Sequence, residues 1–166
     1  MIFFNNTAEK TLIVLNDLLR INNDRIACYE RAMENEKNLD MDMKQMFRKI
    51  IDETNINKQQ LIGRIRKLSR DPKDTTTLSG VLHRAWTDLK VTLIGNTRNA
   101  MINFCLYNEE ITQHTYRAAL NMPDKIEADV RELIEQQHQG LKKTYEEVKE
   151  CREARNYLSP RLAYFN

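Results

Sequence analysis

The chain has 166 residues, a formal net charge of +2 and 30% charged residues. This length suits a single domain over residues 1–166, and the interleaving of acids and bases excludes the strongly basic surface typical of nucleic-acid binding. With four Gly and three Pro, the sequence offers few of the turns that a β-fold needs, so we expect an all-α protein.

Cysteine usage and hydropathy bear on where the protein works. Cys28, Cys105 and Cys151 are odd in number and far apart, which favours neither a disulfide framework nor a zinc site. No segment approaches the roughly 18 apolar residues that cross a membrane, and the N-terminal residues lack the basic region of a signal peptide. We therefore expect a cytoplasmic protein with no membrane partner.

The first expected helix covers residues 7–36. Asn6 and Glu9 have the spacing of a capping box at its start. Its inward positions alternate steps of three and four, which places them on one stripe facing a bundle core. They are Leu12, Leu15, Leu19, Asn22, Ile26, Tyr29 and Met33.

The second expected helix covers residues 40–68 and has a polar middle. Its inward positions are Phe47, Ile50, Ile51, Thr54, Leu61, Ile65 and Leu68. A shorter amphipathic stretch follows at residues 78–93 and carries Trp86 on its apolar face. We expect His83 and Trp86 to anchor this short helix to the outside of the bundle.

Two more long helices are expected at residues 97–121 and 124–155. The inward positions of the third are Ile102, Leu106, Glu109, Gln113, Tyr116 and Leu120. Those of the fourth are Ile134, His138, Leu141, Tyr145 and Val148. The tail at residues 156–166 contains Pro160 and is expected to be a loop or a short extension.

An internal repeat relates the first and third long helices. Residues 87 positions apart match in four places, which are Asn16 with Asn103, Leu19 with Leu106, Tyr29 with Tyr116, and Ala32 with Ala119. Two related helical hairpins joined by about 28 residues predict a bundle with a crossover connection, since a simple up-and-down bundle needs only a short loop.

This arrangement resembles the ferritin-like superfamily, rubrerythrins included. The likeness is closest to an uncharacterised bacterial family of ferritin-like four-helix bundles, and it covers about Leu12 to Arg155. The stretches that carry it are Leu82-His83-Arg84-Ala85-Trp86-Thr87-Asp88-Leu89-Lys90, Leu15-Asn16-Asp17-Leu18, Tyr116-Arg117-Ala118 and Gln139-Gly140. Membership implies a ferritin-like four-helix bundle, but a shared fold implies no activity.

The resemblance raises the question of a metal site. A ferritin-like di-iron centre takes a Glu from each of two helices and a Glu-x-x-His from each of the other two. Glu109 lies seven residues before Tyr116, and Glu135 with His138 forms one Glu-x-x-His. The other half of this ligand set is missing. Asn22 stands where a Glu is expected in the first helix, and the second helix has no His and offers only carboxylates such as Glu53.

We therefore expect no di-iron centre and no cofactor, although Glu109, Glu135, His138 and Glu53 remain candidate ligands for a single iron or manganese ion. We expect Glu109, Glu135 and His138 to face one another across the core. The alternative for these positions is a hydrogen-bonded polar layer of Asn22, Thr54, Glu109 and His138, with the hydroxyls of Tyr29 and Tyr116 satisfied in it.

Three functions stay open at this point. The first is a non-catalytic bundle that acts by association, as in a stress response. The second is a metal-dependent redox or storage protein, and the third is a binder of a small apolar ligand. No nucleophile with its base and no phosphate-binding loop is present, which argues against an enzyme, and the apolar ends Ile2-Phe3-Phe4 and Leu162-Ala163-Tyr164-Phe165 predict a homodimer.

Overall fold

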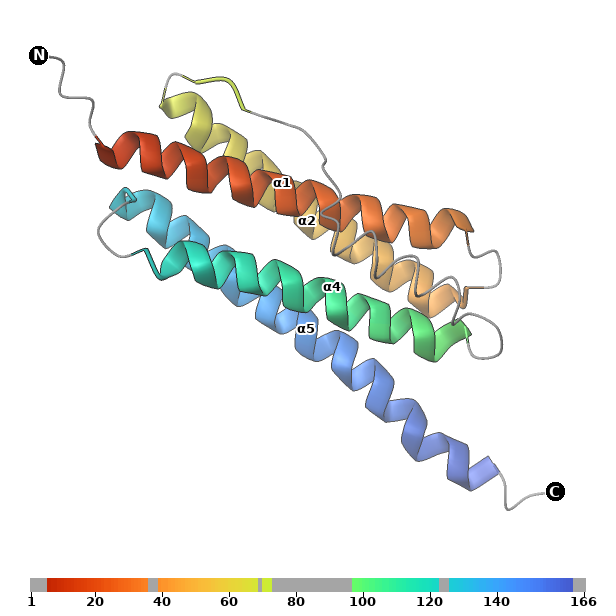
Figure 1. Cartoon of the computed structure of the whole chain (residues 1–166). Helices are drawn as coiled ribbons and strands as arrows, with labels where there is room; N and C mark the ends of the chain where they lie inside the picture. The colour runs from red at the N-terminus through yellow and green to blue at the C-terminus, as the bar shows by residue number, and fades with distance from the viewer. Residues whose placement is uncertain (1–5, 36–38, 69, 73–96, 123–125, 163–166) are drawn as a thin grey trace, which may run out of the picture.

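A computed structural model describes residues 6–35, 39–68, 70–72, 97–122 and 126–162, and the side chains of Asn6, Asn35, Thr97 and residues 154–162 are not described. Within these ranges all regular structure is helical. The four long helices are α1 (Asn6–Asn35), α2 (Met41–Lys67), α4 (Thr97–Leu120) and α5 (Ala128–Leu162). They pack side by side as a four-helix bundle (Figure 1).

Three of the four long helices begin and end close to the expected bounds, and the fourth differs. Helix α5 begins at Ala128 and continues through Pro160 to Leu162, so the expectation of a fourth helix ending at residue 155 is wrong. No Gly or Pro interrupts the chain between Leu141 and Ser159, and a Pro in the last turn leaves the earlier hydrogen bonds intact. The expected helix at residues 78–93, with His83 and Trp86, lies outside the described residues.

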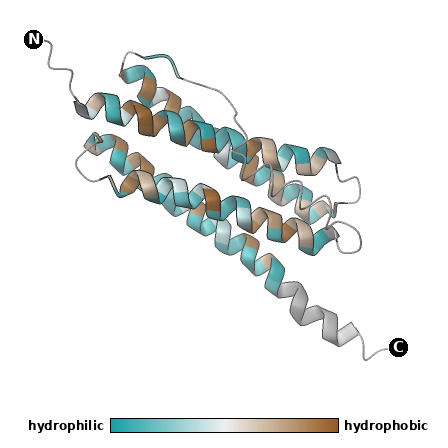
Figure 2. Ribbon diagram, in the orientation of Figure 1, coloured by the Kyte–Doolittle hydropathy of each residue, from teal (hydrophilic) through white to brown (hydrophobic). Residues whose placement is uncertain are grey.

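The helices pack as two pairs. Helix α1 packs mainly against α2, and α4 mainly against α5; α1 also contacts α4, whereas α2 and α5 touch less. Hydrophobic and hydrophilic residues alternate along each helix, as expected for amphipathic helices (Figure 2). The core combines aliphatic side chains with a Tyr29 and Phe47 ring pair whose centroids are 5.1 Å apart.

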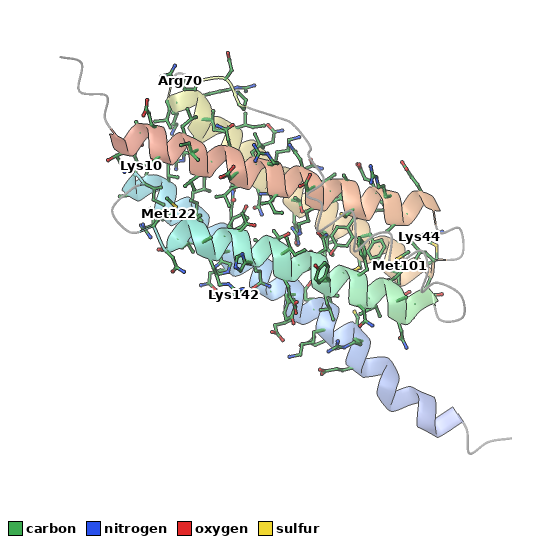
Figure 3. All side chains as sticks on the ribbon, viewed as in Figure 1. Lys10, Lys44, Arg70, Met101, Met122 and Lys142 are labelled. Carbon is green, nitrogen blue, oxygen red and sulfur yellow. The ribbon has the colours of Figure 1, made fainter. Side chains whose placement is uncertain are left out.

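The starts of α2 and α4 lie at the same end of the bundle. Arg98 at the start of α4 donates hydrogen bonds to Asp40 Oδ2 at 2.6 Å and to Asp42 Oδ2 at 2.8 Å, both at the start of α2. Figure 3 shows the same relationship, with Lys44 and Met101 at one end and Arg70 and Met122 at the other. Helices α2 and α4 are therefore parallel. None of the helices in the described ranges has an apolar stretch long enough to span a bilayer.

Candidate functional site

The centre of the bundle contains a buried ion pair between Arg25 of α1 and Glu109 of α4. Arg25 Nε donates to Glu109 Oε1 at 2.9 Å, and Arg25 Nη2 donates to Glu109 Oε2 at 2.7 Å. The side chains are 1% and 0% exposed. Two parallel hydrogen bonds to one carboxylate are the strongest geometry available to an arginine and fix both side chains in place.

Two hydroxyl groups complete this ion pair. The third arginine nitrogen, Arg25 Nη1, donates to Thr54 Oγ1 of α2 at 2.6 Å, and that hydroxyl in turn donates to the Ile50 carbonyl at 2.5 Å. Tyr29 donates its hydroxyl to Glu109 Oε1 at 2.7 Å. The carboxylate thus accepts three hydrogen bonds, and the network joins α1, α2 and α4 at one level of the bundle.

The electrostatics keep Arg25 charged and Tyr29 protonated. Burial opposes the charge of Arg25, but the charge and hydrogen bonds of Glu109 raise the pKa of Arg25 above its ordinary value. Burial and the Glu109 charge raise the pKa of Tyr29 well above its ordinary value, so Tyr29 remains a hydrogen-bond donor. Removing either charged partner would leave the other buried and unpaired, which is far more costly than keeping the pair.

A second polar network lies next to the first. Asn22 Nδ2 donates to Tyr116 Oη at 2.8 Å, and Tyr116 donates to Gln137 Oε1 of α5 at 2.8 Å. Gln137 Nε2 donates to Gln60 Oε1 at 2.9 Å and to the Asn57 carbonyl at 3.1 Å, both on α2. Burial raises the pKa of Tyr116 to about 12, which keeps its hydroxyl protonated. The chain of bonds crosses the bundle from α1 to α2.

His138 lies beside this second network without joining it. Its ring stacks on Tyr116 with centroids 6.4 Å apart and planes 17° from parallel. The residue is 5% exposed, and its Nε2 atom is buried without a hydrogen-bond partner. Burial, followed by the charges of Lys142 and Arg117, lowers the pKa of His138, so its ring stays neutral near pH 7.

The candidate metal ligands do not come together. Glu135 is exposed on the outer side of α5, so the expectation that it faces Glu109 across the core is wrong. Glu53 is half-buried and accepts a hydrogen bond from Thr144 at 3.3 Å. Both oxygens of Glu109 are taken by Arg25 and Tyr29. In the part of the chain that the structure describes, no group of three His, Cys, Asp or Glu residues is arranged to hold a metal ion.

These residues therefore do not fit the di-iron centre that the ferritin-like resemblance implies. A metal needs a carboxylate with free lone pairs, whereas the Glu109 carboxylate is already neutralised by a guanidinium. The expected polar layer is present in altered form: Asn22, Thr54, Glu109, Tyr29 and Tyr116 lie in two networks with Arg25 at the centre of one. His138 makes no hydrogen bond in either network. Arg25 was not among the inward positions expected for the first helix.

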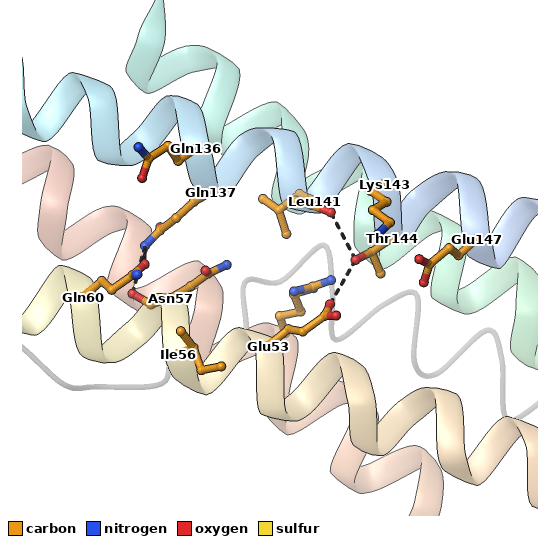
Figure 4. Close-up of a pocket in the computed structure, with 12 residues that line it drawn as sticks. Glu53, Ile56, Asn57, Gln60, Gln136, Gln137, Leu141, Lys143, Thr144 and Glu147 are labelled. Atoms are coloured by element: carbon orange, nitrogen blue, oxygen red, sulfur yellow. Dashed lines mark hydrogen bonds between the residues drawn. The ribbon is translucent and has the colours of Figure 1, made fainter.

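A cavity of about 280 Å³ opens between α2 and α5, the two neighbouring helices that touch least. In Figure 4, Glu53, Ile56, Asn57 and Gln60 line it from α2, and residues from Gln136 to Glu147 line it from α5. Arg25 of α1 also forms part of its wall. Polar residues in the middle of α2 and the missing side chain of Gly140 on α5 leave this space unfilled. The cavity thus leads from the surface to the buried ion pair.

The profile of a family described as Domain of unknown function (DUF2383) matches residues 10–122, which is more than half of the chain. The chain belongs to this family. The DUF2383 match spans α1, α2 and α4 and so includes Arg25, Thr54 and Glu109, which form the central network. No curated protein matches the chain. The DUF2383 family carries no assigned activity, so the function must be argued from the geometry of the site.

Proposed function

We propose that this DUF2383 protein is a ferritin-like four-helix bundle that acts by binding other molecules and not by metal or redox catalysis. The observation that carries the proposal is the bidentate ion pair of Arg25 with Glu109. A permanent guanidinium cation supplies the positive charge that a metal supplies in a di-iron bundle. The cation belongs to the chain itself, so the core keeps its carboxylate without a bound ion.

The ferritin-like part of the proposal includes a crossover between α2 and α4. Its support is the parallel direction of these helices, which follows from the hydrogen bonds of Arg98 to Asp40 and Asp42. A helix of 27 residues is about 40 Å long at 1.5 Å per residue. The end of α2 and the start of α4 therefore lie about one helix length apart, which supports a crossover connection.

We also propose that the protein is a homodimer in a reducing, cytoplasmic setting. The cysteines Cys28, Cys105 and Cys151 are free thiols, and burial raises the pKa of Cys28 to about 12, which makes it unreactive. The apolar ends that motivate the dimer lie outside the described residues. Light scattering of the whole chain at tens of micromolar tests this part, and a monomer there contradicts it.

Metal analysis tests the main proposal. Protein purified without chelator and then incubated with Fe²⁺ or Mn²⁺ should retain far less than one ion per chain after desalting. Arg25→Lys keeps the positive charge but loses the planar guanidinium group, and this variant should also retain far less than one ion per chain. One or two tightly retained ions per wild-type chain, lost in Glu109→Gln, would contradict the proposal and favour the alternative of an iron- or manganese-binding redox or storage protein.

A further inference from the structure

The cavity between α2 and α5 has a charged side chain in its wall whose hydrogen bonds are incomplete. A guanidinium has five N–H donors, and Arg25 uses three of them, on Glu109 and Thr54. The remaining two N–H groups have no hydrogen-bond acceptor among the described residues. Arg25 is 1% exposed and lines the cavity, so the cavity is the route by which an oxygen atom from solvent or from a ligand can reach these donors, and buried donors are normally satisfied.

The charges around the cavity argue against an ionic ligand. Its described wall contains two cations, Arg25 and Lys143, and two anions, Glu53 and Glu147. Arg25 is already neutralised by Glu109, and Lys49 forms an ion pair with Glu147 at 2.6 Å. The two wall charges that remain, on Lys143 and Glu53, have opposite signs, so the wall has no net charge that would offset the lost hydration of an anion or a cation.

The uncharged wall residues favour a ligand that has hydrogen-bonding groups on one side and a small apolar group on the other. The amides of Asn57, Gln60 and Gln136 offer both donors and acceptors, and Ile56 and Leu141 provide apolar contact. Ile56 is 60% exposed at the rim, so its apolar surface is open to contact with a ligand. At about 280 Å³, the cavity is near the lower limit for small-molecule sites.

We propose that this cavity binds a small neutral molecule that presents a carbonyl or hydroxyl oxygen to the free N–H groups of Arg25. The inference deepens the proposed binding function and rests on it, because it requires Arg25 to remain paired with Glu109. The rest of the ligand contacts the amides of α2 and α5 and covers Ile56. The ligand class is set by hydrogen bonding and size, since the balanced charges exclude selection by charge.

An NMR titration of the whole chain with three related sugars tests this inference. The probes are N-acetylglucosamine, which is neutral, glucuronate, which is anionic, and glucosamine, which is mainly cationic near neutral pH. We expect N-acetylglucosamine to cause saturable shifts of the Arg25 Nε–H signal and of the Asn57 and Gln60 side-chain amides. The two charged sugars should bind at least about tenfold more weakly, a difference of 1.4 kcal/mol.

A matched pair of variants shows whether the shifts come from the cavity. Gly140 lines the cavity and Gly63 does not, yet a Cβ added at either position meets nothing within 4 Å. Gly140→Leu should fill the space and weaken binding of N-acetylglucosamine at least about tenfold, whereas Gly63→Leu should bind as wild type does. Both variants place a good helix former in a helix, so both should fold.

Three results would overturn the inference. These are shifts that rise linearly without saturation, equal binding by Gly140→Leu and wild type, and tighter binding of glucuronate than of the neutral sugar. The titration uses protein whose metal content has been measured. A metal-containing core with a sugar-binding cavity would then contradict the proposed function alone, while a metal-free core without sugar binding would contradict this inference alone.

Discussion

Tyr29 and Tyr116 are 87 positions apart and make equivalent contacts across the core. The hydroxyl of each tyrosine bonds the residue seven positions before the other tyrosine. Tyr29 donates to Glu109 at 2.7 Å, and Tyr116 accepts from Asn22 at 2.8 Å. The internal repeat is therefore a relationship in space, with α1 and α4 exchanging equivalent contacts across the core. The two halves differ in charge, because the position of Glu109 in one half is occupied by Asn22 in the other.

The charge difference leads to a prediction for the ion pair itself. Arg25→Met or Glu109→Leu alone should lower the free energy of unfolding by about 3–5 kcal/mol, because each leaves a buried charge without its partner. The double variant should recover part of this loss, since an apolar pair of similar volume removes both buried charges, although the Tyr29 hydroxyl loses its acceptor. Urea unfolding of the four proteins gives the coupling energy. Simple addition of the two losses would contradict a direct pair.

The two tyrosines should differ in the cost of losing their hydroxyls. Tyr29→Phe removes a hydrogen bond to a charged carboxylate and should cost about 1.5–3 kcal/mol. Tyr116→Phe removes bonds between neutral groups and should cost about 0.5–1.5 kcal/mol, partly because Asn22 Nδ2 keeps its 2.7 Å bond to the Leu18 carbonyl. Thermal or urea unfolding measures both. A larger cost at Tyr116 would contradict the position of Glu109 at the centre of the network.

Both glycines of the long helices offer a gain in stability. Gly63 and Gly140 lie in α2 and α5, and an added Cβ at either meets nothing within 4 Å. Gly63→Ala and Gly140→Ala should each raise the free energy of unfolding by roughly 0.5–1 kcal/mol, because alanine restricts the unfolded chain and favours the helix. Gln139→Ala, at an exposed neighbouring position, is a control that should change stability by less than about 0.5 kcal/mol. A loss at Gly140 would mean that α5 has no open space beside α2.

His138 gives the stability a pH dependence. Its pKa is lowered in the folded protein, so below the unfolded value of about 6.5 the unfolded chain binds a proton that the folded chain does not. Stability from this group is therefore present above about pH 6.5 and is lost as the pH falls toward the folded pKa. His138→Phe keeps a ring against Tyr116 and should show a smaller loss of melting temperature between pH 7.5 and 5.5. An unchanged pH dependence would contradict a neutral, buried His138.

The sequence was sufficient to predict the four long helices and most of their inward faces. Steps of three and four residues placed Leu15, Leu19, Asn22 and Tyr29 on the core side of α1, and all four are buried. This works because the helical period alone determines which residues share a face. The bounds of α5 were harder to predict, because a single Pro near a helix end does not determine where that helix stops.

The central ion pair could not be predicted by the same reasoning. Arg25 lies three residues after Asn22 and four before Tyr29, so its spacing already indicated the core face. A charged residue is almost never fully buried without a partner, and that partner, Glu109, is 84 positions away. Glu135 failed for a different reason. His138 lies at the edge of the buried face of α5, and a step of three residues moves a position by about 60° around the helix axis, so Glu135 lies just beyond that face and is exposed.

The most direct test of the core is a crystal structure determined after soaking in Mn²⁺, with anomalous scattering used to locate the metal. We predict guanidinium density from Arg25 against both oxygens of Glu109 and no anomalous peak in contact with that carboxylate. A manganese peak bound to Glu109, with Arg25 turned away, would contradict the account, and two peaks about 3.5–4 Å apart would show a working two-metal site.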